Sequence, residues 1–268
     1  MRAAVALVLA AVLVVACSGP ASSLGGSGGA NATELMVLGA ASLKGVLAKA
    51  KTAYEAAHPD IRLTISTDSS AALETQIEQG APADVFLSAD TSNPKKLVDK
   101  GLADGSARAF ATNLLIVIVP AANAAAIKSP LDLARTGIKI VAAGEAVPIF
   151  KYAADLLANL ARQPGYPADF AARYTSNVVS HEDNVGGVVA KVELGEADAG
   201  IVYRTDASAS TKVATVAIPP EANVPATYAG VVIKASPHRP AAAAFLDWLV
   251  GADGQALLGT FGFLPPTS

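Results

Sequence analysis

Cysteine, histidine and charged residues are all scarce in this sequence, and each shortage argues against a class of protein. Its one cysteine, Cys17, cannot form a disulfide within the chain. His58, His181 and His238 lie far apart and have no partner ligands at metal spacing, so we expect no metal site. No Ser-His-Asp or Cys-His set is evident, so we expect no enzyme. Charged residues make up 16% of the chain with a net charge of -3, which disfavours nucleic-acid binding.

Hydrophobic residues are abundant, at 52%, and one run of them opens the chain. Arg2 precedes the small and apolar run Ala3–Ala16, which is too short for a confident transmembrane span. The segment Val-Val-Ala-Cys that ends at Cys17 resembles a bacterial lipobox. We therefore predict a signal peptide over residues 1–17, lipidation of Cys17 and a flexible Ser/Gly/Ala tether over 18–32. The protein would be exported and anchored to the outer face of the cell membrane, or periplasmic; an ordinary secretory signal with a chance cysteine is the alternative.

After the tether, apolar strand-like runs alternate with helical stripes. This alternation is typical of an α/β fold and predicts parallel sheets with crossover helices. Helix stripes follow several of the runs, for example Leu43, Val46, Leu47, Ala50 and Tyr54 at helical spacing. The predicted strands are Glu34–Gly39, Ile61–Ser66, Val85–Leu87, Leu114–Val119, Lys139–Ala142, Ala199–Tyr203 and Ala229–Lys234.

Hydrogen-bond donors gather where the predicted helices begin. Ser42 is expected as the N-cap of the first helix, Ser70 begins the second, and Pro148 stands at a first-turn position. Asp183 or Asn184 is expected to cap a helix that continues with glycines. Unpaired N–H groups and hydroxyls at such starts form an uncharged cradle for an anion. Taken singly, each serine is more often a plain cap, and Tyr203 is by default an amphipathic tyrosine at a strand end.

Several longer motifs carry a resemblance to a known family. They are Ala40–Leu43, the run from Gln76 to Asp90 with its Gly-Ala-Pro-Ala-Asp core, Gly200–Tyr203 and the closing Gly262-Phe263. Together they resemble the periplasmic molybdate-binding proteins of ABC transporters, the ModA family, in lipoprotein form. The resemblance implies a two-lobed type II periplasmic solute-binding fold with the ligand cleft between the lobes.

The same resemblance implies a ligand and the residues that bind it. The ligand would be molybdate or tungstate, with no cofactor, and the protein would be a monomer that delivers the ion to a membrane permease. Ser42 and Ser70 would offer hydroxyl and backbone contacts, and Tyr203 a phenol. Ile149 and Val185 would offer backbone N–H groups, and Ser69 an additional contact.

The division into lobes rests on the resemblance rather than on composition. Crossings near Thr112-Asn113 and Ala226-Thr227 would give one lobe from 33–113 plus 226–268 and a second from 114–225. Two lobes joined in this way would close on the ligand by a hinge.

Three departures from the family pattern keep other functions open. Asp68 stands where the family usually has a small neutral residue, and its carboxylate could accept a proton from a ligand, as phosphate recognition requires. We expect instead a helix-cap carboxylate that points away from the cleft. Ile149-Phe150-Lys151 is bulkier than usual, and Arg204 is unusual beside the tyrosine. The alternatives are a binder of sulfate or phosphate, an enzyme on the same fold, and a purely structural lipoprotein.

Overall fold

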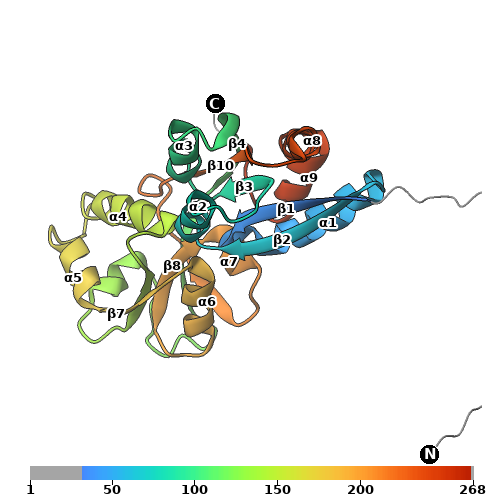
Figure 1. Cartoon of the computed structure of the whole chain (residues 1–268). Helices are drawn as coiled ribbons and strands as arrows, with labels where there is room; N and C mark the ends of the chain where they lie inside the picture. The colour runs from blue at the N-terminus through green and yellow to red at the C-terminus, as the bar shows by residue number, and fades with distance from the viewer. Residues whose placement is uncertain (1–31, 267–268) are drawn as a thin grey trace, which may run out of the picture. The chain divides into compact units, whose positions relative to one another are not determined.

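The computed structural model describes residues 32–266, whose strands form two five-stranded sheets surrounded by helices (Figure 1). The predicted signal peptide, Cys17 and all of the predicted tether except Ala32 lie outside the described residues. Within 32–266, no helix is both long enough and apolar enough to cross a membrane.

The first sheet combines strands from the beginning and the end of the described chain. Its order is β2-β1-β3-β10-β4, and β1 pairs in parallel with both β2 and β3. The strands are β1 (Thr33–Ala40), β2 (Ile61–Asp68), β3 (Val85–Ser88), β4 (Ala103–Asn113) and β10 (Ala226–Ile233).

The second sheet lies entirely in the middle of the chain. Its order is β7-β6-β8-β5-β9, and β6 pairs in parallel with β7 and β8. The strands are β5 (Leu115–Pro120), β6 (Ile140–Ala143), β7 (Val178–Glu182), β8 (Ala199–Tyr203) and β9 (Val213–Val216). The chain thus passes from one sheet to the other after β4 and returns before β10. The division of the chain into two lobes at the predicted boundaries stays a prediction.

The expectation of parallel sheets is wrong in one respect. Each sheet contains one reversed strand in the fourth position, β10 in the first sheet and β5 in the second, and each of these pairs antiparallel with both neighbours. These are the strands that follow the two passages between the sheets. The chain enters each new sheet at the carboxyl ends of its parallel strands. The first strand that it forms there therefore runs antiparallel to its neighbours.

Helices cover both faces of the first sheet, because its side chains alternate between two clusters. Val85 and Leu87 pack into the main core, whereas Phe86 packs into a second cluster with Leu73 and Leu97. The helices after strands of this sheet are α1 (Lys44–Ala57), α2 (Ser70–Glu78), α3 (Ser92–Asp99), α8 (Arg239–Val250) and α9 (Ala252–Thr260). Those associated with the second sheet are α4 (Pro148–Leu160), α5 (Phe170–Ser176), α6 (Val185–Glu193) and α7 (Arg204–Ser208). Short 3-10 turns cover Ala41–Leu43 and Pro130–Ala134.

The carboxyl ends of the parallel strands position the helix starts that the sequence singled out. The short turn Ala41–Leu43 and α1 follow β1, and α2 follows β2. In the second sheet, α4, α6 and α7 follow β6, β7 and β8. Ligands of open α/β sheets bind outside these strand ends, and here the chain crosses between the sheets at the same ends. The fold therefore brings helix N-termini from both sheets toward one region.

Gly200, in the middle of β8, allows α6 to pack closely against the second sheet. A Cβ at Gly200 would lie 2.7 Å from Val188 Cγ1 of α6 and 3.1 Å from the Val141 carbonyl oxygen. We predict that Gly200→Ala lowers the free energy of unfolding by about 1–3 kcal/mol through overpacking. The measurement is the denaturant midpoint at unchanged m-value. Gly259→Ala is the control, since nothing lies within 4 Å of that Cβ and alanine favours the α9 helix. Equal midpoints for the two variants would contradict the tight packing.

Candidate functional site

Residues from the strand ends of both sheets line one small cavity. Ser42, Ser69 and Ser70 contribute from the first sheet, and Val185 and Tyr203 from the second; Ala40, Ala41, Ala89, Val147, Pro148 and Asn184 complete the lining. The cavity measures about 10 Å³, on a scale where holding one water molecule requires about 10–15 Å³. A four-oxygen anion is larger than this volume.

Ile149 is the one predicted site residue whose side chain lies elsewhere. That side chain is buried and lines a separate cavity of about 270 Å³, together with Tyr174 and Phe150. Its backbone N–H stands at the second position of α4, directly after the cavity-lining Val147 and Pro148. An N–H at that position has no acceptor within the helix. A backbone contact from Ile149 to a ligand stays a prediction.

Ser42 is not the helix cap that we expected. Ala41–Leu43 forms a 3-10 turn, α1 starts at Lys44, and neither start has a side-chain cap. The Ser42 hydroxyl instead shares a hydrogen bond of 2.8 Å with the Tyr228 hydroxyl. The prediction was wrong because a local pattern cannot reveal a partner 186 positions away. The hydroxyl is therefore held by the first sheet and not by its own helix.

A further residue supports the Tyr228 hydroxyl. Asn113 Oδ1 accepts from the Leu114 N–H at 3.0 Å, so the Asn113 amide nitrogen faces the other way. It donates to Thr205 Oγ1 at 2.8 Å and to Tyr228 Oη at 3.4 Å. Tyr228 Oη thus contacts both Asn113 and Ser42, and these contacts fix the position of the Ser42 hydroxyl at the cavity.

Sequence reasoning missed this supporting set, in which Tyr228 holds Ser42 and Asn113 holds Tyr228. Asn113 was recognised only as part of a crossing point, and the predicted strand Ala229–Lys234 began one residue after Tyr228. Tyr228 is fully enclosed, and burial raises the pKa of its hydroxyl well above the ordinary value. A tyrosine in an apolar strand gives no local sign that its hydroxyl has a polar partner.

Ser69 and Ser70 occupy the start of α2 as predicted, but their hydroxyls do not cap the helix. The helix begins at Ser70, Ser69 is its extended N-cap residue, and no side-chain cap bond forms. Ser70 is buried, and its Oγ accepts from the Ala89 N–H at 3.0 Å. An oxygen that already accepts one hydrogen bond can still donate its own hydrogen. Ser70 is thus held at the cavity as a donor.

The start of α6 agrees with the sequence analysis. Asn184 is the N-cap, and its Oδ1 accepts from the Gly187 N–H at 3.1 Å. Val185 is the first helical residue, so its N–H has no acceptor within the helix. Both residues line the cavity. This helix start therefore adds a backbone donor from the second sheet.

Tyr203 supplies the least satisfied group in the cavity. The residue is 1% exposed, and its hydroxyl oxygen is buried without a hydrogen-bond partner. Burial, chiefly, and the nearby Tyr228 raise the pKa of this hydroxyl well above its ordinary value, so it stays protonated. The other buried side-chain oxygen without a partner among residues 32–266, Glu74 Oε1, belongs to a carboxyl whose second oxygen lies 3.5 Å from Lys96 Nζ. Tyr203 thus presents a hydrogen-bond donor that lacks an acceptor.

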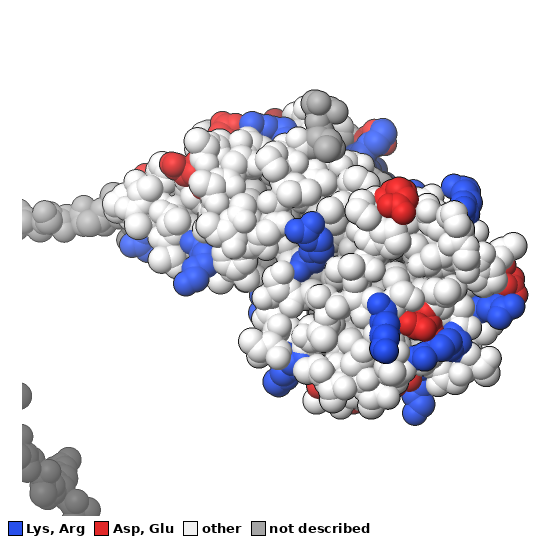
Figure 2. All heavy atoms as spheres, turned by 180° about the vertical axis from the view of Figure 1, so that it is seen from behind, with Lys and Arg blue, Asp and Glu red and all other residues white. Residues whose placement is uncertain are grey.

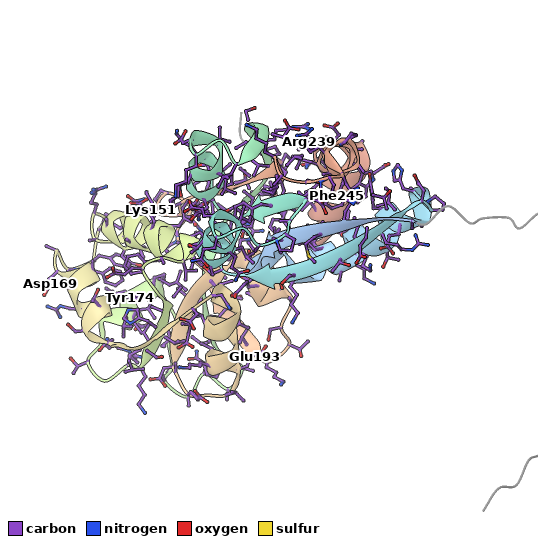
Figure 3. The ribbon with its side chains drawn as sticks, in the orientation of Figure 1. Lys151, Asp169, Tyr174, Glu193, Arg239 and Phe245 are labelled. Atoms are coloured by element: carbon purple, nitrogen blue, oxygen red, sulfur yellow. The ribbon has the colours of Figure 1, made fainter. Side chains whose placement is uncertain are left out.

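Charged side chains are excluded from the cavity lining. None of the residues that line it is Lys, Arg, Asp or Glu. Lys44, Lys151 and Arg204, the basic residues nearest the helix starts, are exposed. Lys151 on α4 forms an ion pair with Asp155, and Figure 3 marks its place on this helix. The face in Figure 2 likewise mixes both signs between wide uncharged areas. An anion here would be held by hydrogen bonds and helix N-termini instead of a countercharge.

Asp68 takes an unexpected position beside the cavity. Its Oδ1 accepts from the Ser69 N–H at 2.7 Å and from Asn184 Nδ2 at 2.9 Å. We expected a cap carboxylate that points away from the cleft, but the side chain reaches toward α6 of the other sheet. Asp68 does not line the small cavity; it lines an adjoining cleft of about 610 Å³. Within residues 32–266, no cluster of His, Cys, Asp or Glu is arranged to hold a metal ion.

Comparisons with known proteins identify relatives over nearly the whole chain. The family described as bacterial extracellular solute-binding protein matches residues 35–264. The molybdate-binding protein ModA of Mycobacterium tuberculosis is 33% identical over 97% of this chain and 95% of its own length. The putative ABC transporter substrate-binding lipoprotein YvgL of Bacillus subtilis is 30% identical over 97% of this chain and 96% of its own length.

A solved structure supports the same grouping. The periplasmic molybdate-binding protein of Azotobacter vinelandii aligns with a TM-score of 0.72 and 25% identity, covering 87% of this chain and all of that one. The predicted fold class, an α/β type II periplasmic solute-binding fold, is confirmed by this likeness and by the two sheets.

Asp206, at the start of α7, leads to a prediction about pH and stability. Its Oδ2 accepts from the Tyr203 N–H at 3.2 Å. Asp206 as a whole residue is partly exposed to solvent, but its carboxyl group is buried. This burial raises the pKa of the carboxyl group from 3.8 to about 7. The folded state therefore binds this proton more tightly than the unfolded chain, and stability falls as pH rises from about 4 to about 7.

We predict that Asp206→Asn, which cannot ionise, gains stability relative to the unmodified chain between pH 5 and pH 8. The expected gain is on the order of 1–4 kcal/mol, since one pKa unit corresponds to about 1.4 kcal/mol. Chemical denaturation at several pH values measures it. Asp253→Asn, at an exposed carboxylate, is the control and should show no such trend. Parallel pH profiles for Asp206→Asn and the unmodified chain would refute a buried, perturbed carboxyl.

Proposed function

The chain belongs to the bacterial extracellular solute-binding proteins and, within them, to the family of the molybdate-binding proteins ModA, and we propose that it captures molybdate. Tungstate, an ion of nearly the same size, would be a second ligand. The protein would deliver the ion to the permease of an ABC transporter. The site residues would be Ser42, Ser70 and Tyr203 through hydroxyls, and Ile149 and Val185 through backbone N–H groups, with Ser69 as an additional contact.

One observation carries this proposal: the cavity presents buried donors and no charged side chain. The Tyr203 hydroxyl has no partner within the described chain, and the Ser70 oxygen accepts from the Ala89 N–H and keeps its own hydrogen to donate. The Ser42 hydroxyl is held at the cavity by its hydrogen bond with Tyr228. Buried donors without acceptors cost free energy, so a ligand made only of acceptors is favoured. A fully deprotonated tetrahedral dianion is such a ligand.

Sulfate and phosphate are the competing ligands. Phosphate near neutral pH carries a proton and requires an acceptor, whereas the cavity lining contains no carboxylate. Asp68 lines the adjoining cleft and not the cavity, and its Oδ1 accepts from Ser69 and Asn184. Sulfate has shorter bonds than molybdate, so it would leave some donors unmet, each costing about 1–3 kcal/mol. These arguments support molybdate over both, with binding and no reaction at the cavity.

Closure and anchoring complete the proposal. The lobes would be 33–113 plus 226–268 and 114–225, and a hinge motion between them would admit the ion into a cavity that is otherwise too small. Cys17 would carry the lipid that anchors a monomer at the outer face of the membrane. A relative named as a lipoprotein and aligned over 97% of this chain supports that reading.

Thermal unfolding with molybdate, tungstate, sulfate and phosphate at equal excess tests the ligand. A ligand that binds only the folded state stabilises it by about 2.7 kcal/mol at a hundredfold excess over Kd. We predict a rise in melting temperature with molybdate and tungstate and little with the other two.

Tyr203→Phe should weaken molybdate binding about tenfold to hundredfold, because one buried hydrogen bond is lost. Tyr174→Phe, at another buried tyrosine of the same half of the chain, is the matched control and should leave binding unchanged.

Other outcomes of this experiment would each revise the proposal. A shift with phosphate or sulfate alone would keep the family and overturn the ligand. Equal effects of Tyr203→Phe and Tyr174→Phe on molybdate binding would show that the ligand does not bind in this cavity.

Lipidation is tested separately by replacing Cys17. We predict that Cys17→Ala abolishes labelling by a radioactive fatty acid and moves the protein from the membrane fraction to the soluble extracytoplasmic fraction. Ser18→Ala should do neither. Fatty-acid labelling that persists in Cys17→Ala, or its absence in the unmodified protein, would show that Cys17 is not the anchor.

A further inference from the structure

One carboxylate oxygen connects helix starts that belong to different sheets. Asp68 is the last residue of β2, and its Oδ1 accepts from the N–H of Ser69, the N-cap residue of α2. The same oxygen accepts from Asn184 Nδ2, the N-cap side chain of α6, which follows β7. The three residues are half-buried or buried, so the contact is partly shielded from water.

Asn184 is held in the orientation that this contact requires. Its Oδ1 accepts from the Gly187 N–H at 3.1 Å, so its Nδ2 faces away from its own helix and donates to Asp68 at 2.9 Å. A serine or aspartate could also cap α6, but neither offers an N–H donor. Asparagine is therefore a cap that can also bridge to a carboxylate.

The bridge lies at the edge of the proposed ligand cavity. Ser69 and Asn184 line the cavity, and Asp68 stands directly behind them in the adjoining cleft. Two helix N-termini with partial positive charge meet here, and a carboxylate shared between them reduces their mutual repulsion. Breaking the bridge would let the two helix starts separate, which is the motion that would open the cavity.

We propose that Asp68 and Asn184 form a latch across the cleft, which holds the starts of α2 and α6 around the bound oxyanion and slows its release. This inference rests on the proposed function for its ligand. It makes Asp68 a positioning residue that acts through Asn184, not an acceptor for a protonated ligand. The latch uses an uncharged amide against a carboxylate, so it can open without separating an ion pair.

Loss of the Asp68 charge and loss of the latch should change the rate of molybdate release in opposite directions. A carboxylate near a dianion repels it, so the loss of charge alone would strengthen molybdate binding and slow release. Loss of the latch would have the opposite effect. Asp68→Asn removes the charge but keeps an oxygen that can accept from Ser69 and Asn184, whereas Asp68→Ala removes both.

Stopped-flow measurement of molybdate association and dissociation on the full chain separates these cases. We expect Asp68→Ala to dissociate about tenfold faster, with a smaller change in association, and Asp68→Asn to dissociate no faster than the unmodified protein. Asn184→Gly, which is tolerated at a helix N-cap but has no side chain to bridge, should match Asp68→Ala. The double variant Asp68→Ala/Asn184→Gly should be no faster than either single variant, because they remove one shared contact. Asp183→Ala removes a neighbouring exposed carboxylate from the same cleft and should not accelerate release.

Dissociation from Asp68→Ala that is unchanged or slower would overturn the latch, as would single effects that add in the double variant. Failure of the unmodified protein to bind molybdate would overturn the proposed function instead. In that case, small-angle X-ray scattering of the unliganded proteins would test the latch. It predicts a larger radius of gyration for Asp68→Ala than for Asp68→Asn, and equal radii would refute it.

Discussion

A buried hydrogen-bond donor that has no acceptor is the constraint on which this site depends. The Tyr203 hydroxyl ends β8 inside the protein, protonated and without a partner in the described chain. Around it, Tyr228 holds the Ser42 hydroxyl, and Asn113 contacts Tyr228. The Ala89 N–H occupies an acceptor site of Ser70 and leaves the Ser70 hydrogen for the cavity. Under the proposed function, a bound group that only accepts hydrogen bonds would lower the free energy of this arrangement, and without charged lining residues the anion would be selected by geometry.

The two sheets make this arrangement possible because their parallel strands end at the same place. Helix starts from both sheets reach the cavity, and the reversed strands β5 and β10 carry the chain between the sheets at these ends. Under the proposed function, ligand entry and a separation of the two sheets would be coupled, since the cavity walls come from both. Asp68 and Asn184 fit this scheme as a contact that resists the separation.

Much of the framework could be predicted from local sequence, whereas the polar contacts that support the site could not. Pro148 and Val185 start helices as expected, and β8 has the predicted bounds, because turn residues and apolar runs are local signals. The edge strand β4 was not predicted, since its outer half is polar and exposed. The partner of Ser42 and the bridge from Asp68 to Asn184 span 186 and 116 positions, and only the folded chain brings them together. The resemblance supplied the family and the ligand, which neither periodicity nor composition could supply.

Crystals grown with tungstate would test the central claim most directly, because tungsten scatters anomalously and its position can be read without prior assumptions. We predict one strong anomalous peak in the cavity, with ligand oxygens within hydrogen-bond distance of Ser42 Oγ, Ser70 Oγ and Tyr203 Oη. A peak at another place, or a cavity in which the Tyr203 hydroxyl still lacks an acceptor, would contradict it.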